Sequence, residues 1–267
     1  MNREVLITGG SGTVARAAGK YLTSQGIHVI GVSRSVGEDS DYFTETHKLD
    51  LLDKKDLTKL QKILEHVDAV FHLAWNVSKE NFNTGEKWEG NMQMFENVMQ
   101  AAEKAEVPIF INGSSIHAGT GNIPAYTAET SLENTPEPYR SSIDPEDDYD
   151  LRKEDPEKLL DPRDNEPDSP YGESKVETER KMREAVKEEE FEIGVSIRIG
   201  GVNPEDRDHL EGEPYYSSLY WSHKDLGRTL EHIVKADIEE KKGYHQFYGV
   251  SDNKGRIFNI ENSFIGR

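Results

Sequence analysis

The N-terminal 26 residues contain three features in a row that together predict a parallel α/β fold. Residues 5–7 form a short, wholly apolar run, which is typical of a strand buried on both faces of a sheet. A glycine-rich turn follows at residues 8–13, and an amphipathic helical pattern then continues to Gly26. Because the later chain repeats this alternation of short apolar strands and helical patterns, we expect a doubly wound parallel sheet.

The same turn predicts a phosphate-binding loop. Glycines between a strand and a helix let the backbone approach a pyrophosphate, which the helix N-terminus then stabilises. The third glycine of the usual pattern is Ala15, which is small enough for close helix–strand packing. The alternative interpretation is a plain tight turn. The cofactor contacts expected from this segment are Gly9, Ser11, Gly12, Thr13 and Val14.

The second predicted strand, residues 28–32, ends at the position that distinguishes two nicotinamide cofactors. A carboxylate there binds the ribose 2′-hydroxyl of NAD, whereas an arginine suits the 2′-phosphate of NADP. This chain has Ser33 and Arg34 and no carboxylate. The sequence therefore favours NADP over NAD, unless Arg34 points to solvent as surface arginines usually do.

Three further strands are predicted to end at the same edge of the sheet, where open α/β folds bind ligands. The third ends at residues 48–51, where Asp50 meets an adenine amino group, and the fourth spans 69–75, where Ala74 leaves room for a ribose or phosphate. The fifth strand, 108–115, ends in two serines. The cofactor contacts expected here are Asp50, Leu51, Leu73, Ala74 and Trp75.

A later helix carries a tyrosine and a lysine on one face. Ser169 is suited to cap this helix and Pro170 to its first turn. Tyr171 and Lys175 are four residues apart, so their side chains are neighbours. A nearby ammonium and the positive end of a helix both favour the phenolate, so we expect a lowered pKa and a proton-carrying Tyr171. The alternative is a surface helix with an ordinary tyrosine and lysine.

One buried strand carries a charge. Arg198 lies within the apolar run 194–200, and arginine is rarely buried without a partner. It therefore either pairs with a carboxylate of the protein or binds an anionic substrate.

Composition excludes several classes of partner. The chain of 267 residues has a net charge of -19, which repels nucleic acids and anionic membranes. It has no Cys, so disulfides and thiolate zinc sites are excluded, and it lacks an apolar run of ~18 residues. We expect a soluble cytoplasmic protein. Its acidity has two explanations, a halophilic surface suited to high salt or local acidic inserts.

The segment 120–168 differs in composition from its surroundings. Eight of the 11 prolines lie between Pro124 and Pro170, and five acids cluster at residues 144–150. Three tyrosines give the segment something to pack, so we expect a partly ordered lid. We interpret the acids as a solvated loop rather than as a metal site, and no metal is expected.

These motifs occur in an order that resembles one large family. The ordered set comprises the turn 8–15, Asp50, His-Leu-Ala at 72–74, Ser-Ser at 114–115 and Tyr-Gly-Glu-Ser-Lys at 171–175. It resembles the extended short-chain dehydrogenase/reductase superfamily, the NAD-dependent epimerase/dehydratase group, over nearly the whole chain. The resemblance implies a single domain, 1–267, with a Rossmann core at 1–119 and 169–200, an insert at 120–168 and a small substrate lobe at 201–267.

The resemblance also implies roles for individual residues. Tyr171 would be the catalytic acid/base, and Lys175 would lower its pKa and hold the nicotinamide ribose. Ser114 would bind the reacting oxygen, with Ser115 beside it, and Asn91 would lie behind the active site. The expected cofactor contacts therefore also include Asn91, Tyr171, Lys175 and Ile199, and the expected substrate contacts are Ser115, His117 and Arg198.

Four shorter motifs, at 114–117, 167–172, 197–200 and 248–253, resemble a narrower branch, the uronate dehydrogenases. That branch includes archaeal enzymes that oxidise glucose 6-phosphate, and it generally uses NAD. Its members take a hydride from the anomeric carbon and make a lactone. The arginine that matches Arg198 binds the anionic end of the substrate there.

The expected function is therefore NAD(P)-dependent oxidation of a small sugar, uronate or sugar phosphate. Only about a third of the chain follows Tyr171, which favours a small substrate over a nucleotide-linked sugar. The alternatives are a sugar-nucleotide epimerase or dehydratase that recycles its cofactor, and a non-catalytic cofactor-sensing protein. By analogy with the superfamily, a homodimer would form through the helices that start near Trp88 and Pro170.

Overall fold

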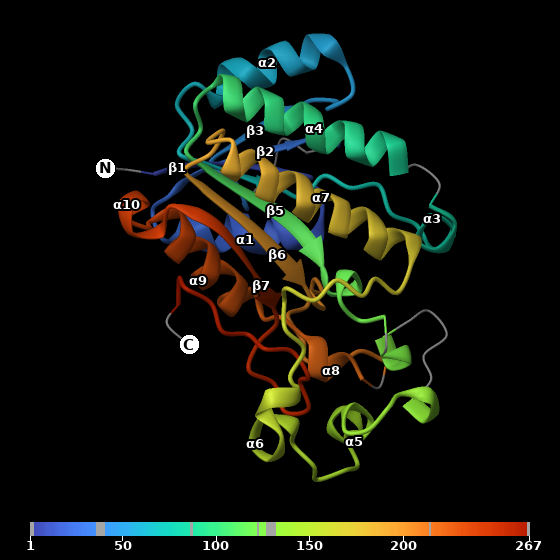
Figure 1. The fold of residues 1–267 in the computed structure, drawn as a ribbon. Helices are drawn as coiled ribbons and strands as arrows, with labels where there is room; N and C mark the ends of the chain where they lie inside the picture. The colour runs from blue at the N-terminus through green and yellow to red at the C-terminus, as the bar shows by residue number, and fades with distance from the viewer. Residues whose placement is uncertain are drawn as a thin grey trace.

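The computed structural model describes residues 3–35, 41–85, 88–121, 123–126, 132–213 and 215–265, and a seven-stranded parallel sheet runs through them (Figure 1). The strand order is β3-β2-β1-β4-β5-β6-β7, which confirms the predicted doubly wound sheet. The third and fourth strands end three residues earlier than expected, so Asp50 and Ala74 lie in the loops beyond them. The strands are β1 (Glu4–Thr8), β2 (His28–Ser33), β3 (Glu45–Lys48), β4 (Ala69–His72), β5 (Ile109–Ser115), β6 (Ile193–Ile199) and β7 (Gly243–Gly249).

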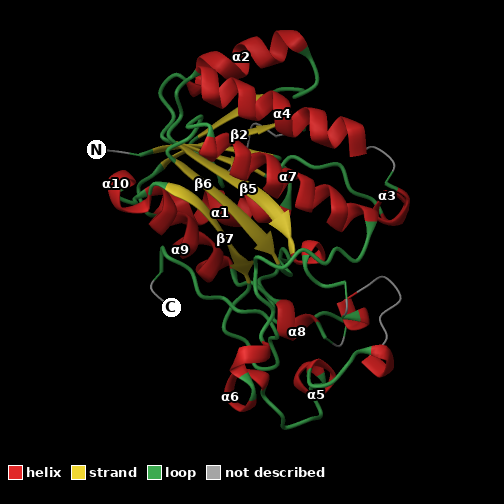
Figure 2. Ribbon diagram, viewed as in Figure 1, coloured by secondary structure: helices red, strands yellow, loops and turns green. Residues whose placement is uncertain are grey.

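Helices cover both faces of the sheet (Figure 2). One face packs against α1 (Thr13–Ser24) and α9 (His223–Val234). The other face packs against α2 (Lys54–Leu64), α4 (Trp88–Lys104) and α7 (Pro170–Lys187). No helix in the described ranges is long and apolar enough to cross a membrane. The shorter helices are α3 (Lys79–Thr84), α5 (Tyr139–Ile143), α6 (Leu151–Glu154), α8 (Tyr216–Leu219) and α10 (Ile238–Lys241).

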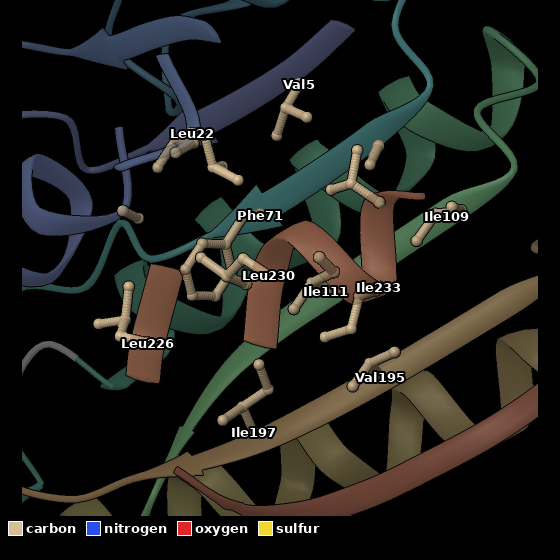
Figure 3. Close-up of a cluster of buried hydrophobic side chains, with 14 of the residues drawn as sticks. Val5, Leu22, Phe71, Ile109, Ile111, Val195, Ile197, Leu226, Leu230 and Ile233 are labelled. Carbon is tan, nitrogen blue, oxygen red and sulfur yellow. The ribbon is translucent and has the colours of Figure 1, made fainter. Parts of the chain in front are cut away.

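The central strands are mostly apolar because both faces of the sheet are buried there, whereas the edge strand β3 is polar and partly exposed. Side chains alternate between the two faces, so Val5 and Ile7 belong to the cluster under α1 and α9, whereas Leu6 belongs to the cluster under α2, α4 and α7. Figure 3 shows the first cluster, in which Phe71 and Leu230 meet between β4 and α9. This pattern explains why the strands lack the polar alternation of a half-exposed sheet.

The insert forms a third hydrophobic cluster with the C-terminal part of the chain. Tyr126, Ile143 and Leu151 from the insert pack with Ile257 and Phe258. A backbone bridge joins residue 160 to residue 258, and Figure 1 shows α5, α6 and α8 together beyond the carboxyl ends of the strands. The described residues of the insert therefore pack onto the C-terminal segment rather than standing apart as a lid. The domain boundaries drawn from the sequence stay a prediction.

Helices α1 and α9 approach each other closely at one glycine. A Cβ built on Gly227 of α9 would lie 2.0 Å from Cγ of Tyr21 in α1. The Tyr21 hydroxyl also donates a hydrogen bond to Glu231, at 3.3 Å. Only a residue without a side chain fits this crossing.

We expect Gly227→Ala to destabilise the fold by about 1–3 kcal/mol, because the added methyl group overpacks the α1–α9 contact. Gly90→Ala is the matched control. Gly90 also lies inside a helix, but nothing lies within 4 Å of a Cβ there, so this change should stabilise by about 0.5–1 kcal/mol. Urea unfolding of both variants measures the difference, and equal midpoints would show that the crossing is not tight.

Candidate active site

The carboxyl ends of β1, β2 and β4 surround a pocket of about 180 Å³. The strand order reverses direction between β1 and β4, and a crevice at such a switch point is where open α/β sheets bind ligands. Eight of the residues expected to contact a cofactor line the pocket. They are Gly9, Ser11, Ser33, Arg34, Asp50, Leu51, Ala74 and Trp75.

The glycine turn leaves the start of α1 open to this pocket. Gly9 has a φ of +70°, and a Cβ on it would lie 3.0 Å from the backbone of Leu73 and Ala74. Gly12 is the N-cap of α1, so Thr13 and Val14 begin the helix. No side chain caps this end and its first turn has no acidic residue, so backbone N–H groups are available to an anion. These features fit the pyrophosphate of a dinucleotide.

The loop after β4 is held in place from two sides. The Thr8 hydroxyl accepts hydrogen bonds from the backbone N–H groups of Leu73 and Ala74, at 3.0 and 3.1 Å. The Asn91 side chain bonds both the N–H and the carbonyl of Asn76, at 2.7 and 3.0 Å. Asn91 is buried, and it acts on the cofactor pocket by fixing the loop that lines it.

Tyr171 lies at the start of α7, next to Ser115. Ser169 caps this helix by accepting a hydrogen bond from the Gly172 N–H, as its position before Pro170 predicted. A Cβ on Gly172 would lie 2.1 Å from the His117 carbonyl oxygen, so the glycine brings the helix against the turn after β5. The Ser115 side chain lies close enough to the Tyr171 hydroxyl to lower the pKa of the phenol.

The pKa of Tyr171 is opposite in direction to the sequence prediction. Burial raises it to about 12, although the Ser115 bond opposes the shift. Lys175 does not offset this effect, because its Nζ donates to the Gly113 carbonyl at 2.9 Å and lies 3.7 Å from the centre of the Trp75 ring. Burial lowers the pKa of Lys175 itself to about 7. The phenol therefore keeps its proton near neutral pH in this structure.

Ser114 points away from Tyr171. Successive residues of a strand face opposite sides, and the Ser114 hydroxyl donates to Glu179 Oε1 at 2.5 Å. The structure thus brings Ser115, and not Ser114, to the tyrosine. Ile199, at the end of β6, is partly buried, and its side chain lies near Gly113.

Arg198 pairs with a carboxylate of the protein, which is the first of the two alternatives that the sequence left open. Its Nε and one terminal nitrogen donate to the two Glu179 oxygens, both at 2.8 Å, and neither side chain is exposed by more than 1%. The other N–H groups bond the Asp164 carbonyl, Asn165 and the Tyr248 hydroxyl. All five donors are used, so this structure does not present Arg198 to a substrate as predicted.

His117 lies beside Tyr171 in the candidate site. Its Nδ1 is 2.6 Å from Oδ2 of Asp168, and its ring centre is 5.8 Å from that of Tyr171. Phe82 of α3 packs against both rings, with centroids 4.8 Å from His117 and 5.3 Å from Tyr171. A small pocket lined by Trp75, Asn91 and Tyr171 joins this region to the cofactor pocket, since both share Trp75.

Three residues of the site were missed by sequence reasoning. The sequence spacing could have indicated Glu179, because this residue lies four residues after Lys175 and continues the helix face that carries Tyr171. Asp168 directly precedes the helix cap and was not distinguished from the other acids of the insert. No sequence pattern indicated Phe82. In the described ranges, no three His, Asp or Glu residues gather closely enough to hold a metal ion.

Comparisons with known proteins agree with this geometry. A model of the NAD dependent epimerase/dehydratase family matches residues 5–153. An NAD-dependent glucose-6-phosphate dehydrogenase from Haloferax volcanii is 28% identical over 269 residues, covering 98% of this chain and 90% of that protein. A solved uronate dehydrogenase from Agrobacterium tumefaciens has a TM-score of 0.67 and 19% identity, covering 96% of this chain and 80% of its own. A glucuronic acid dehydrogenase from Chromohalobacter salexigens has the same TM-score and identity, covering 98% and 81%.

We expect Ser115→Ala to lower kcat by about 100-fold, because it removes the hydroxyl that lies beside Tyr171 and would bind the reacting oxygen. Ser114→Ala is the matched neighbour. It should change kcat by less than about threefold but destabilise the fold by about 1 kcal/mol through the lost bond to Glu179. Steady-state kinetics and urea unfolding of both variants separate the two effects. A large loss of kcat in Ser114→Ala alone would show that Ser114, and not Ser115, binds the reacting oxygen.

Proposed function

The chain belongs to the NAD-dependent epimerase/dehydratase family, and from that premise we propose that it oxidises a small sugar, uronate or sugar phosphate. The family confirms the resemblance seen in the sequence and makes the chain an NAD-dependent enzyme. The observation that carries the proposal is the placement of Tyr171 beside the cofactor pocket, with the Ser115 hydroxyl acting on its phenol and Lys175 one helical turn away. The three relatives described above are named as sugar dehydrogenases, which supports the same substrate class, while other similar solved structures are named as sugar-nucleotide epimerases.

The residues around Tyr171 divide the chemistry between them. When bound, an oxidised nicotinamide supplies the hydride acceptor and a positive charge. Ser115 holds the sugar hydroxyl, and Tyr171 Oη takes the proton that this hydroxyl loses. Because the pKa of Tyr171 is about 12 here, Oη must first release its own proton to water before it can accept the proton of the sugar hydroxyl. Lys175 aids that step when its Nζ is charged and turned from Gly113 toward the phenol.

The position of Arg198 bears on the choice of sugar. Its guanidinium is fully used by Glu179 and the insert, so a carboxylate or phosphate of the substrate needs a different anchor. We propose that substrate hydroxyls, held by Ser115 and His117, provide most of the recognition. This arrangement suits a small sugar and leaves its anionic group near the outer part of the site.

The experiment that tests this function is reduction of NADP+ and NAD+, followed at the nicotinamide absorbance. The panel contains glucose 6-phosphate, glucose, glucuronate and galacturonate, each at low and high salt. One sugar should give turnover, and Tyr171→Phe should reduce kcat with that sugar at least ~100-fold while leaving cofactor affinity unchanged. Normal turnover by Tyr171→Phe would refute the mechanism.

A flat panel would favour one of the alternatives. Cofactor bound to the purified protein without net reduction would indicate a sugar-nucleotide epimerase or dehydratase, as the family name also allows. Cofactor binding without turnover across a broad panel would indicate a sensing protein. The cytoplasmic location, the halophilic surface and the homodimer stay predictions, and light scattering tests the last.

We further propose that NADP is the preferred cofactor. Ser33 and Arg34 line the pocket at the end of β2, where the ribose is expected, and Arg34 is exposed. Asp50 lines the pocket from the loop after β3, and its carboxylate accepts the Leu52 N–H at 3.0 Å. An arginine beside two serines provides a cation and hydroxyls for a 2′-phosphate.

Arg34→Ala should raise the KM for NADP+ about tenfold or more, because a charge-assisted hydrogen bond contributes about 1.5–3 kcal/mol. The KM for NAD+ should stay within about twofold, since NAD lacks the 2′-phosphate. Ser35→Ala, from the same pocket wall, is the control and should have a small effect on either cofactor. A wild type that prefers NAD+, with Arg34→Ala neutral toward both, would contradict the NADP assignment.

A further inference from the structure

Asp168 joins the turn after β5 to the start of α7. Its side chain is only 1% exposed, yet it accepts three side-chain hydrogen bonds. His117 Nδ1 and the Thr120 hydroxyl bond one oxygen, at 2.6 and 2.8 Å, and the Ser169 hydroxyl bonds the other at 2.7 Å. The Asp168 backbone N–H also bonds the His117 carbonyl, at 3.2 Å. Asp168 thus fixes His117 relative to the helix that carries Tyr171.

This contact determines which ring nitrogen of His117 carries the proton. Hydrogen bonds from His117, Ser169 and Thr120 lower the pKa of Asp168 against the effect of burial, so the side chain is a carboxylate that only accepts. His117 Nδ1 must therefore be the donor. In a neutral imidazole the other nitrogen, Nε2, then has a free lone pair.

His72 shows the opposite arrangement in the same chain. The Thr8 hydroxyl accepts from two backbone N–H groups, so its own hydrogen goes to His72 Nδ1, at 3.0 Å. Nε2 of His72 then carries the proton, and it is the buried side-chain atom left without a partner in the described ranges. The neighbouring group, a hydroxyl or a carboxylate, thus sets the tautomer at each histidine.

His117 Nε2 is open to the active site. The side chain is 20% exposed, and within the described part of the chain no hydrogen bond reaches Nε2. Phe82, His117 and Tyr171 form a cluster in which each ring lies against the other two, so the imidazole lies beside the tyrosine. A substrate bound at Ser115 and Tyr171 would be within reach of this nitrogen.

We propose that Asp168 is a positioning residue that keeps the proton of His117 on Nδ1, so that Nε2 accepts a hydrogen bond from a substrate hydroxyl. The substrate part of this inference rests on the proposed sugar oxidation. An accepting nitrogen favours a hydroxyl donor and disfavours a carboxylate or phosphate oxygen at the same place. His117 therefore selects for a hydroxyl-bearing part of the sugar, and it is not the anchor for an anionic end.

The first test is the proton position itself, read from long-range proton–nitrogen NMR spectra of the full chain labelled at histidine. The His117 signal is assigned as the one that disappears in His117→Gln. In the wild type we expect the proton on Nδ1. In Asp168→Asn the amide donates to Nδ1, so the proton should move to Nε2, as expected when an amide replaces a carboxylate next to histidine. A wild-type His117 with its proton on Nε2 would overturn the proposal.

The second test is kinetic and uses the panel sugar with the highest turnover. Asp168→Asn should raise its KM about tenfold with kcat nearly unchanged, because the lost bond is made equally in the bound and transition states. The Kd for the cofactor should not change. Thr120→Val is the matched control, since it removes another bond to the same carboxylate without altering the tautomer, and its KM should stay within about twofold. Equal changes of KM in the two variants would show that Asp168 has only a structural role.

The outcomes of these two tests can be distinguished from the failure of the proposed function. The spectra require no turnover, so a flat sugar panel would refute the sugar oxidation while leaving the proton position to be decided by NMR. Turnover of a sugar with an unchanged KM in Asp168→Asn would refute the positioning role and leave the dehydrogenase proposal intact.

Discussion

The buried ion pair between Arg198 and Glu179 connects most of the elements that form the site. It joins β6 to α7, while Ser114 of β5 and Gln246 of β7 bond the same carboxylate. The remaining Arg198 donors bond the end of the insert. Loss of one partner from such a pair costs about 3–5 kcal/mol, because it leaves an uncompensated buried charge. The pair therefore requires α7, and with it Tyr171, to lie at one position over the sheet.

Close backbone approaches complete this arrangement. Gly172 allows α7 to start against the His117 carbonyl, and Gly9 allows the phosphate-binding turn to contact the loop after β4. The same closeness buries Tyr171 and Lys175, so desolvation moves the two pKa values apart, to about 12 for the tyrosine and about 7 for the lysine. Both groups are thus less charged than isolated side chains would be. Their charged forms depend on what binds beside them, which couples the chemistry to occupancy of the site.

Sequence patterns predicted the sheet well, because burial on both faces leaves a strong apolar signal in the central strands. They also identified most of the residues that line the pocket at the switch point, since the carboxyl ends of parallel strands must meet at one edge. Sequence patterns did not predict which of Ser114 and Ser115 faces Tyr171. The two serines are adjacent, and only the twist and register of β5 decide which one faces Tyr171 and which faces Glu179. The partner of Arg198 likewise came from a helix 19 residues earlier in the chain.

The sequence by itself determined most of the strands, the glycine turn and the helix face that carries Tyr171 and Lys175, because each depends on neighbours within a few residues. Tertiary structure decided the protonation states and the hydrogen-bond partners. Those depend on burial and on groups far apart in the chain, such as Asp168 with His117 and Glu179 with Arg198. Local patterns carry no information about desolvation, which here reverses the expected shift of the tyrosine pKa.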